Sequence, residues 1–122
     1  YLELTLNKKL CSDIISKSKS MFFPSKITHD SKIDLLQIDN FSSYEYAYYQ
    51  LIYEITQCVY NGIKFILDSK NTLKEVYISG GFNRNHIFVE YLGQMMPEQK
   101  IKFPKGKNAS ALGAAMLMRG YL

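Results

Sequence analysis

The stretch 76–93, VYISGGFNRNHIFVEYLG, limits the possible folds more than any other part of the chain. It begins with β-branched and aromatic residues, breaks at Gly80 and Gly81, and resumes with apolar residues at helical spacing. This pattern predicts a strand, a tight turn and a helix in succession. Two glycines at such a junction permit positive φ and let a flat ligand lie against the main chain. The junction suits a nucleotide, although a diglycine after a strand is also ordinary loop chemistry.

A second motif occupies 108–117, NASALGAAML, and predicts a helix with one side made almost entirely of Ala and Gly. It follows, about two dozen residues later, a strand that ends in Gly-Gly-x-x-x-Asn, a pairing of motifs that the FGGY carbohydrate kinases share. With both motifs at matching spacing, the chain resembles the C-terminal domain of the FGGY carbohydrate kinases, a branch of the actin-like ATPases. The resemblance runs from about Ser43 to Arg119.

This resemblance implies an α/β fold of the ribonuclease H-like, actin-like ATPase kind, present in part as helix, strand, helix, strand and helix with parallel strands. It divides the chain into an irregular or helical lead-in, 1–42, and the core of the nucleotide-binding domain, 43–122. The implied activity of the parent protein is transfer of a phosphoryl group from ATP to a sugar hydroxyl. Within the family, the form Ser-Gly-Gly-Phe-Asn-Arg-Asn is most similar to rhamnulokinases and fuculokinases.

The same resemblance places Gly80 and Gly81 beside the adenine and ribose of ATP, and Asn85 near the base. Phe82 stands where family members often have Gly or Ala, and its ring either stacks on adenine or narrows the pocket. Asn85 also suits the N-cap of the next helix, and the two roles are compatible because the cap fixes the turn that receives the base. Arg84 either reaches a phosphate or stays solvated.

Phosphoryl transfer also needs an acid or base at the acceptor hydroxyl, a metal ion and charge stabilisation. In the family the catalytic Asp and the sugar-binding residues come from an N-terminal domain, and no Gly-Thr pair of the phosphate-binding turn occurs in the 122 residues. The chain begins at Tyr1 rather than Met, and we expect it to be part of a longer protein. The resemblance therefore implies that this part alone is inactive, and that ATP, Mg, a small sugar and an N-terminal kinase domain complete the parent. A homodimer stays open.

Two other functions also stay open. One is a different actin-like kinase, with the same fold and another acceptor. The other is a non-catalytic interaction module on the kinase scaffold. Phe82 favours the module, as does a tyrosine stripe predicted on the outer side of the longest helix: Tyr46, Tyr49, Tyr53 and Tyr60.

Composition excludes several function classes. With 47% apolar and 21% charged residues the chain is typical of globular protein, and no apolar run is long enough for a membrane span. The net charge of +4 is small for a nucleic-acid-binding protein, and the lysines of 100–107 indicate a solvated strand edge rather than a nucleic-acid patch. Cys11 and Cys58 stand far apart with no neighbouring His or Cys, so neither a metal site nor a disulfide framework is predicted. A cytoplasmic setting is expected.

Local signals place the remaining elements. A capping box of Ser42 and Glu45 starts the longest helix, with Phe41 packing on Tyr46. Phe22 and its aromatic neighbour before a proline predict an extended segment pinned to the core. The predicted ranges, in order, are helix 8–17, helix 43 to about 67 or 68, strand 73–79, helix 86–96, strand 100–103 and a closing helix from an Asn108 cap to Gly120.

Two packing expectations complete the prediction. The core face of the longest helix is expected at an apolar stripe whose members recur at three and four residues: Tyr44, Ala47, Tyr48, Leu51, Ile52, Ile55, Cys58, Val59, Gly62, Ile63 and Ile66. The closing helix is expected to press its small side chains against the sheet beneath the nucleotide pocket. The small residues concerned are Ala111, Gly113, Ala114 and Ala115.

Overall fold

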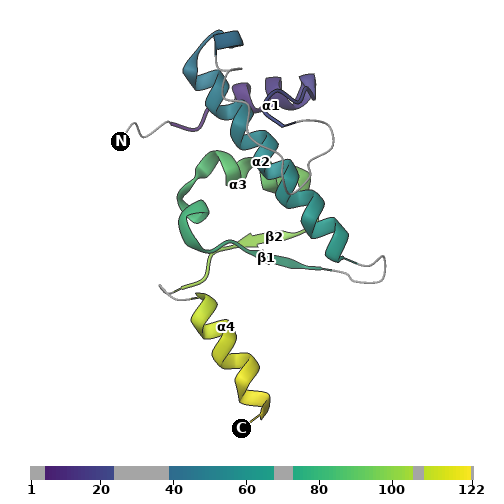
Figure 1. Ribbon diagram of the computed structural model, residues 1–122, viewed down its shortest axis with the longest axis vertical. Helices are drawn as coiled ribbons and strands as arrows, with labels where there is room; N and C mark the ends of the chain where they lie inside the picture. Colours follow the sequence, from purple (N-terminus) through teal and green to yellow (C-terminus); the bar gives the residue numbers. More distant parts are fainter. Residues whose placement is uncertain (1–4, 24–38, 68–72, 106–108, 122) are drawn as a thin grey trace.

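A computed structural model describes residues 5–23, 39–67, 73–105 and 109–121. The described part is a small mixed helix and strand structure with a two-stranded parallel sheet (Figure 1). Its elements, in order, are α1 (Lys8–Lys17), α2 (Tyr44–Ile66), β1 (Glu75–Tyr77), the 3₁₀ turn η2 (Gly80–Arg84), α3 (His86–Met95), β2 (Lys100–Lys102), α4 (Ala109–Met118) and η3 (Arg119–Tyr121). The predicted order of helices and strands is therefore confirmed, and so is the parallel pairing. The Asn108 cap lies outside the described residues.

Each of the first two helices begins at a polar cap. The Asn7 side chain accepts a hydrogen bond from the backbone N–H of Leu10 at the start of α1, which spans the predicted range. At α2 the cap is Ser43, whose hydroxyl accepts from the Tyr46 N–H at 3.1 Å. The predicted cap, Ser42, is wrong by one residue, because either of two adjacent serines can satisfy a free N–H and the sequence does not decide between them.

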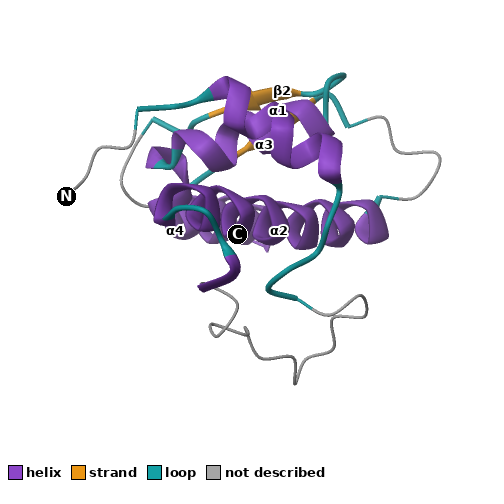
Figure 2. Cartoon of the chain, turned by 90° about the horizontal axis from the view of Figure 1, so that it is seen from above, coloured by secondary structure: helices purple, strands orange, loops and turns teal. Residues whose placement is uncertain are grey.

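Helices α1, α2 and α3 cover one face of the sheet and together form the helical layer. Seen from above, α1 and α3 lie alongside α2 (Figure 2), and both pack against it. Val76 of β1, Ile78 just after it and Ile101 of β2 pack into the core between the sheet and the helices. The core therefore lies between α2, α3 and the upper face of the sheet, and α1 closes it with Cys11 and Ile14.

The core face of α2 overlaps the predicted one, since Ala47 and Ile52 of the predicted stripe are buried, but it is shifted toward the tyrosine stripe. Tyr49 and Tyr53, assigned to an outer stripe, are buried, whereas Tyr44 is 83% exposed and Val59 is half-exposed. The Tyr49 hydroxyl explains part of the shift, because it accepts a hydrogen bond from the Asn7 N–H at 2.8 Å and so holds the start of α1 against this side. Both stripes of α2 are apolar enough to be buried, and the packing of α1 selects between them.

The two strands are shorter than their apolar runs. β1 covers three residues of the predicted 73–79, and β2 ends at Lys102 rather than at Phe103. The register pairs Glu75 with Lys100 and Tyr77 with Lys102. Phe103 was expected on the same face of the strand as Ile101. It lies after the end of β2 and is 48% exposed.

The last helix, α4, extends away from the helical layer and the sheet (Figure 1). Ala111, Ala114 and Ala115 are exposed, and so are Met116 and Leu117. The expected packing of this helix on the sheet is therefore wrong for the described chain. Alanine side chains bury little apolar area, and the outward face of the sheet, described below, carries charged side chains that an apolar helix does not cover favourably.

Candidate functional site

The diglycine forms an elbow between β1 and α3, defined here as residues 79–85. Ile78 is still bonded to the sheet, its N–H donating to the Lys102 carbonyl at 2.9 Å. Ser79 is extended, Gly80 has φ of +75°, and the chain then makes the tight 3₁₀ turn η2 before α3 begins. An L-residue is strained at such a φ, so Gly80 is needed for the turn itself.

Gly81 has a different role from Gly80. Its φ is not in the left-handed range, and a Cβ added to it would meet nothing within 4 Å. Both glycines are exposed. Within the described residues, neither close packing nor backbone strain requires glycine at position 81. Because Gly80 and Gly81 both lack a Cβ, the main chain here is exposed to solvent without side chains.

Asn85 fixes the far side of the elbow. Its Oδ1 accepts from the N–H groups of Ile87 and Phe88 at 3.2 and 3.1 Å, so the predicted N-cap is confirmed. Its Nδ2 donates to the hydroxyl of Tyr48 at 3.1 Å, which ties the elbow to α2. The carbonyl of Phe82 accepts from the Asn85 N–H and closes the turn. The side chain is thus held in place by the cap and keeps one N–H of its amide for another partner.

Phe82 lies on the surface of the elbow. Its ring centroid is 4.7 Å from that of Phe88, a core residue of α3, and the side chain is 45% exposed. One part of the ring packs against Phe88, and another part is exposed to solvent. Because the ring rests on Phe88, it borders the bare glycines without covering them: both glycines stay exposed.

Two residues near the elbow were not found from the sequence. Tyr48 was assigned to the core, but it is partly exposed and accepts the hydrogen bond from Asn85. Tyr48 lies 37 positions from Asn85 in the sequence, so no local pattern predicts their contact. Asn83 has a side-chain oxygen that is buried without a hydrogen-bond partner in the described structure. Nothing in the sequence around Asn83 predicts that its side-chain oxygen is buried.

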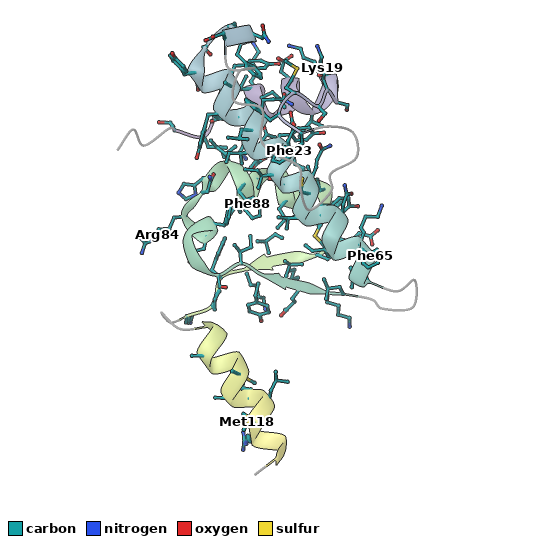
Figure 3. The ribbon with its side chains drawn as sticks, viewed as in Figure 1. Lys19, Phe23, Phe65, Arg84, Phe88 and Met118 are labelled. Atoms are coloured by element: carbon teal, nitrogen blue, oxygen red, sulfur yellow. The ribbon has the colours of Figure 1, made fainter. Side chains whose placement is uncertain are left out.

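The elbow lies at the carboxyl end of the sheet, as the parallel order predicted. Both strands end on the same side, where the chain leaves through the elbow after β1 and through 103–105 after β2 (Figure 1). Open α/β sheets place ligands at this end. Arg84 is exposed and points outward from the elbow (Figure 3). None of the elbow residues is acidic, so the elbow can bind and orient a ligand but offers no carboxylate for proton transfer or metal binding.

The outward face of the sheet is polar. The Lys102 ammonium pairs with the carboxylate of Glu75, which also accepts from the Tyr77 hydroxyl at 2.9 Å. Hydrogen bonding to Lys102 lowers the pKa of Glu75, and the same contact raises the pKa of Lys102. The ring of Tyr77 is 59% exposed on this face.

Two hollows lie away from the elbow. One, of about 510 Å³, opens beside the start of α2 between Lys17, Lys19 and Phe41. Lys17 is already committed there, because it donates to Asp13 and to the Tyr46 hydroxyl, and these bonds raise its pKa. The other, of about 270 Å³, lies between α1, α2 and α3. Neither is lined by an elbow residue.

Glu54, which holds the segment 20–23 against α2, was not predicted from the sequence. Glu54 is 2% exposed in the middle of α2, and its carboxylate accepts hydrogen bonds from the segment that was expected to be pinned only by aromatic side chains. Phe22 of that segment is buried as expected. Glu54 is a structural residue, since every group that contacts it here belongs to the fold.

No protein-family model matches the chain, and searches of curated proteins and of solved structures found no match either. None of the described helices combines the length and the apolar character that a membrane crossing needs. Within the described residues, no three His, Cys, Asp or Glu side chains are grouped so that they could hold a metal ion.

Proposed function

We propose that the chain is the C-terminal part of an ATP-dependent sugar kinase of the FGGY, actin-like type, and that the elbow binds the adenosine portion of ATP. One observation carries the proposal: exposed main chain at Gly80 and Gly81 lies at the carboxyl end of a parallel strand pair and leads into a helix capped by Asn85. The two sequence motifs that resemble the family add to it.

The elbow residues fit a purine nucleoside. A flat base needs main chain without a Cβ, and the Gly80–Gly81 strip offers it. The open part of the Phe82 ring offers an apolar edge for a base, in keeping with stacking rather than blocking, since the ring does not cover the glycines. Asn85 holds the turn and has an amide N–H to donate. ATP would supply the phosphoryl group, and these side chains would bind and orient it.

The chemistry of phosphoryl transfer belongs to the rest of the proposed parent. The elbow has no acid or base, and the described residues hold no group of metal ligands. Binding of Mg and activation of the sugar hydroxyl are therefore assigned to an N-terminal kinase domain. The exposed apolar side chains of α4, among them Leu117, would be covered in that larger protein, because an apolar helix is normally buried.

Calorimetric titration of ATP against the chain tests the proposal. Gly81→Leu should weaken ATP binding by about tenfold or more, because its side chain would occupy the strip while the fold has room for its Cβ. Gly62→Leu is the matched control: that glycine of α2 is also exposed and open, and its substitution should leave the affinity unchanged. Equal ATP affinities in the wild type and Gly81→Leu would refute the proposed site.

Failure to bind ATP at all would favour the non-catalytic module. That alternative now lacks one of its two arguments, because Tyr49 and Tyr53 are buried and do not form an outer tyrosine surface. If ATP binds, a substrate screen on the longer protein separates a sugar kinase from another actin-like kinase. Sugar-dependent ATP turnover by this chain alone would contradict the assignment of the catalytic groups to another domain.

A further inference from the structure

The smaller hollow is separate from the elbow. It lies where α1, α2 and α3 meet, and its α3 residues, Gln94 and Met95, are the last two of that helix. The elbow lies before the first residue of α3. A helix of ten residues is about 15 Å long, so a ligand in the hollow does not overlap a nucleotide base at the elbow.

The lining of the hollow combines apolar side chains with amides and phenols. Ile15 and Met95 pack against the hydrophobic core and supply the apolar surface. The rest of the lining consists of two phenols and three carboxamides: Tyr53, Tyr60, Gln57, Asn61 and Gln94. The lining contains no acidic or basic side chain, which disfavours a phosphate, a carboxylate or an ammonium group as the ligand.

Several hydrogen-bonding groups of the hollow are already oriented. The Gln57 Nε2 donates to the Tyr53 hydroxyl at 2.9 Å, and Tyr53 is 5% exposed with its ring edge-on to Tyr91. This bond leaves the Tyr53 hydroxyl proton and the Gln57 Oε1 for a ligand. The Gln94 Nε2 donates to Glu90 at 2.9 Å, which leaves its carbonyl oxygen free to accept.

Charged side chains of both signs border the hollow. The Lys64 ammonium lies 5.4 Å from the centroid of the Tyr60 ring. Glu90 reaches the other border through Gln94 and is itself paired with the Lys8 ammonium at 4.0 Å. A neutral ligand is therefore favoured over an ion of either sign.

We propose that this hollow binds one small, uncharged, polyhydroxylated ring, such as a cyclitol or a single pyranose. The carboxamides and the Tyr53 hydroxyl would pair with neighbouring hydroxyl groups, and Ile15, Met95 and the Tyr60 ring would contact a C–H face. At about 270 Å³ the hollow lies just below the usual size of ligand sites, so it has room for one ring only. Its few contacts set a dissociation constant on the order of millimolar.

Two-dimensional amide NMR titrations of the chain test this site without reference to nucleotide binding. The probes are myo-inositol for a free cyclitol and methyl β-D-glucoside for the end of a glycan, with glucose 6-phosphate as the charged comparison. We expect saturable shifts at Gln57, Asn61 and Gln94 with at least one neutral probe, and weaker binding of the phosphate. Shifts at the elbow instead, or tighter binding of the phosphate, would overturn the assignment.

Variants separate the site from general effects. Gln57→Leu should weaken binding of the neutral probe by about fivefold or more, because it removes the amide that orients Tyr53. Tyr60→Phe should weaken it about twofold to fivefold, whereas Tyr44→Phe, which removes the same hydroxyl from an exposed position on the same helix, should have no effect. Unchanged affinity in a folded Gln57→Leu protein, or no saturation by either neutral probe, would overturn the proposal. ATP binding is unaffected in either case.

Discussion

The buried carboxylate of Glu54 allows a quantitative test of how the fold holds together. It sits in the middle of α2 and binds a segment more than thirty residues earlier in the chain. Its donors are the N–H groups of Met21, Phe22 and Phe23 at 2.6, 2.9 and 2.9 Å, the Gln50 amide at 2.8 Å and the Ser20 hydroxyl at 3.2 Å. No cation is among these donors, so the buried carboxyl group is satisfied by hydrogen bonds from neutral groups.

Glu54→Gln should reduce the free energy of unfolding by about 2–3 kcal/mol. The substitution keeps the shape but replaces one acceptor oxygen with an NH₂ group that faces N–H donors, and a hydrogen bond to a charged group contributes about 1.5–3 kcal/mol. Glu54→Ala should cost about 3–5 kcal/mol, because several backbone N–H groups then lose their acceptor. These losses are a large share of the roughly 5–15 kcal/mol that stabilises a typical domain.

Urea unfolding followed by far-ultraviolet circular dichroism measures the change. Glu98→Gln, at an exposed position, is the matched control and should stay within about 0.5 kcal/mol of the wild type. Hydrogen exchange should show faster exchange at Met21, Phe22 and Phe23 in Glu54→Gln. A Glu54→Gln protein as stable as the control, with unchanged exchange at these amides, would refute the anchoring role.

Three further substitutions test individual contacts. Gly80→Ala should destabilise the fold by about 1–2 kcal/mol in urea unfolding because of its φ of +75°, and an unchanged midpoint would contradict the strain. Asn85→Ala should reduce the free energy of unfolding by about 1 kcal/mol because the cap is lost, whereas Asn85→Asp should keep most of the stability because Asp also caps helices. Equal losses of stability in the two variants would argue against capping. The lowered pKa of Glu75 means that its pairing stabilises the fold above the pKa of the unfolded carboxyl and is lost as pH falls through the lower folded value. Lys102→Met should raise the pKa of Glu75 in an NMR titration, and no change would exclude Lys102 as its cause.

Elements with local signals were predictable. The bounds of α1, the cap at Asn85 and the parallel strands follow from residues close together in sequence, and the structure has all three. The shift from Ser42 to Ser43 at the start of α2 shows the limit of such signals, because neighbouring residues of one type compete for the same role.

Features that depend on distant partners were not predictable. The buried face of α2 depends in part on the bond between Tyr49 and Asn7, and the role of Glu54 depends on a loop far from it in sequence. The same holds for α4, whose small residues predicted packing against the sheet, whereas the helix extends away from it. At the elbow, the sequence identified Gly80 and Asn85 through their turn and cap chemistry, but the contact of Tyr48 with Asn85 needed the tertiary structure.

Amide NMR titration of the chain with ADP is the sharpest test of whether the bare main chain of the elbow binds a purine nucleotide, as proposed. We expect saturable shifts that are largest at Gly80, Gly81, Phe82 and Asn85, with little change at the hollow between α1, α2 and α3. Absence of saturable shifts at these four residues, or shifts concentrated elsewhere on the chain, would contradict the proposed binding.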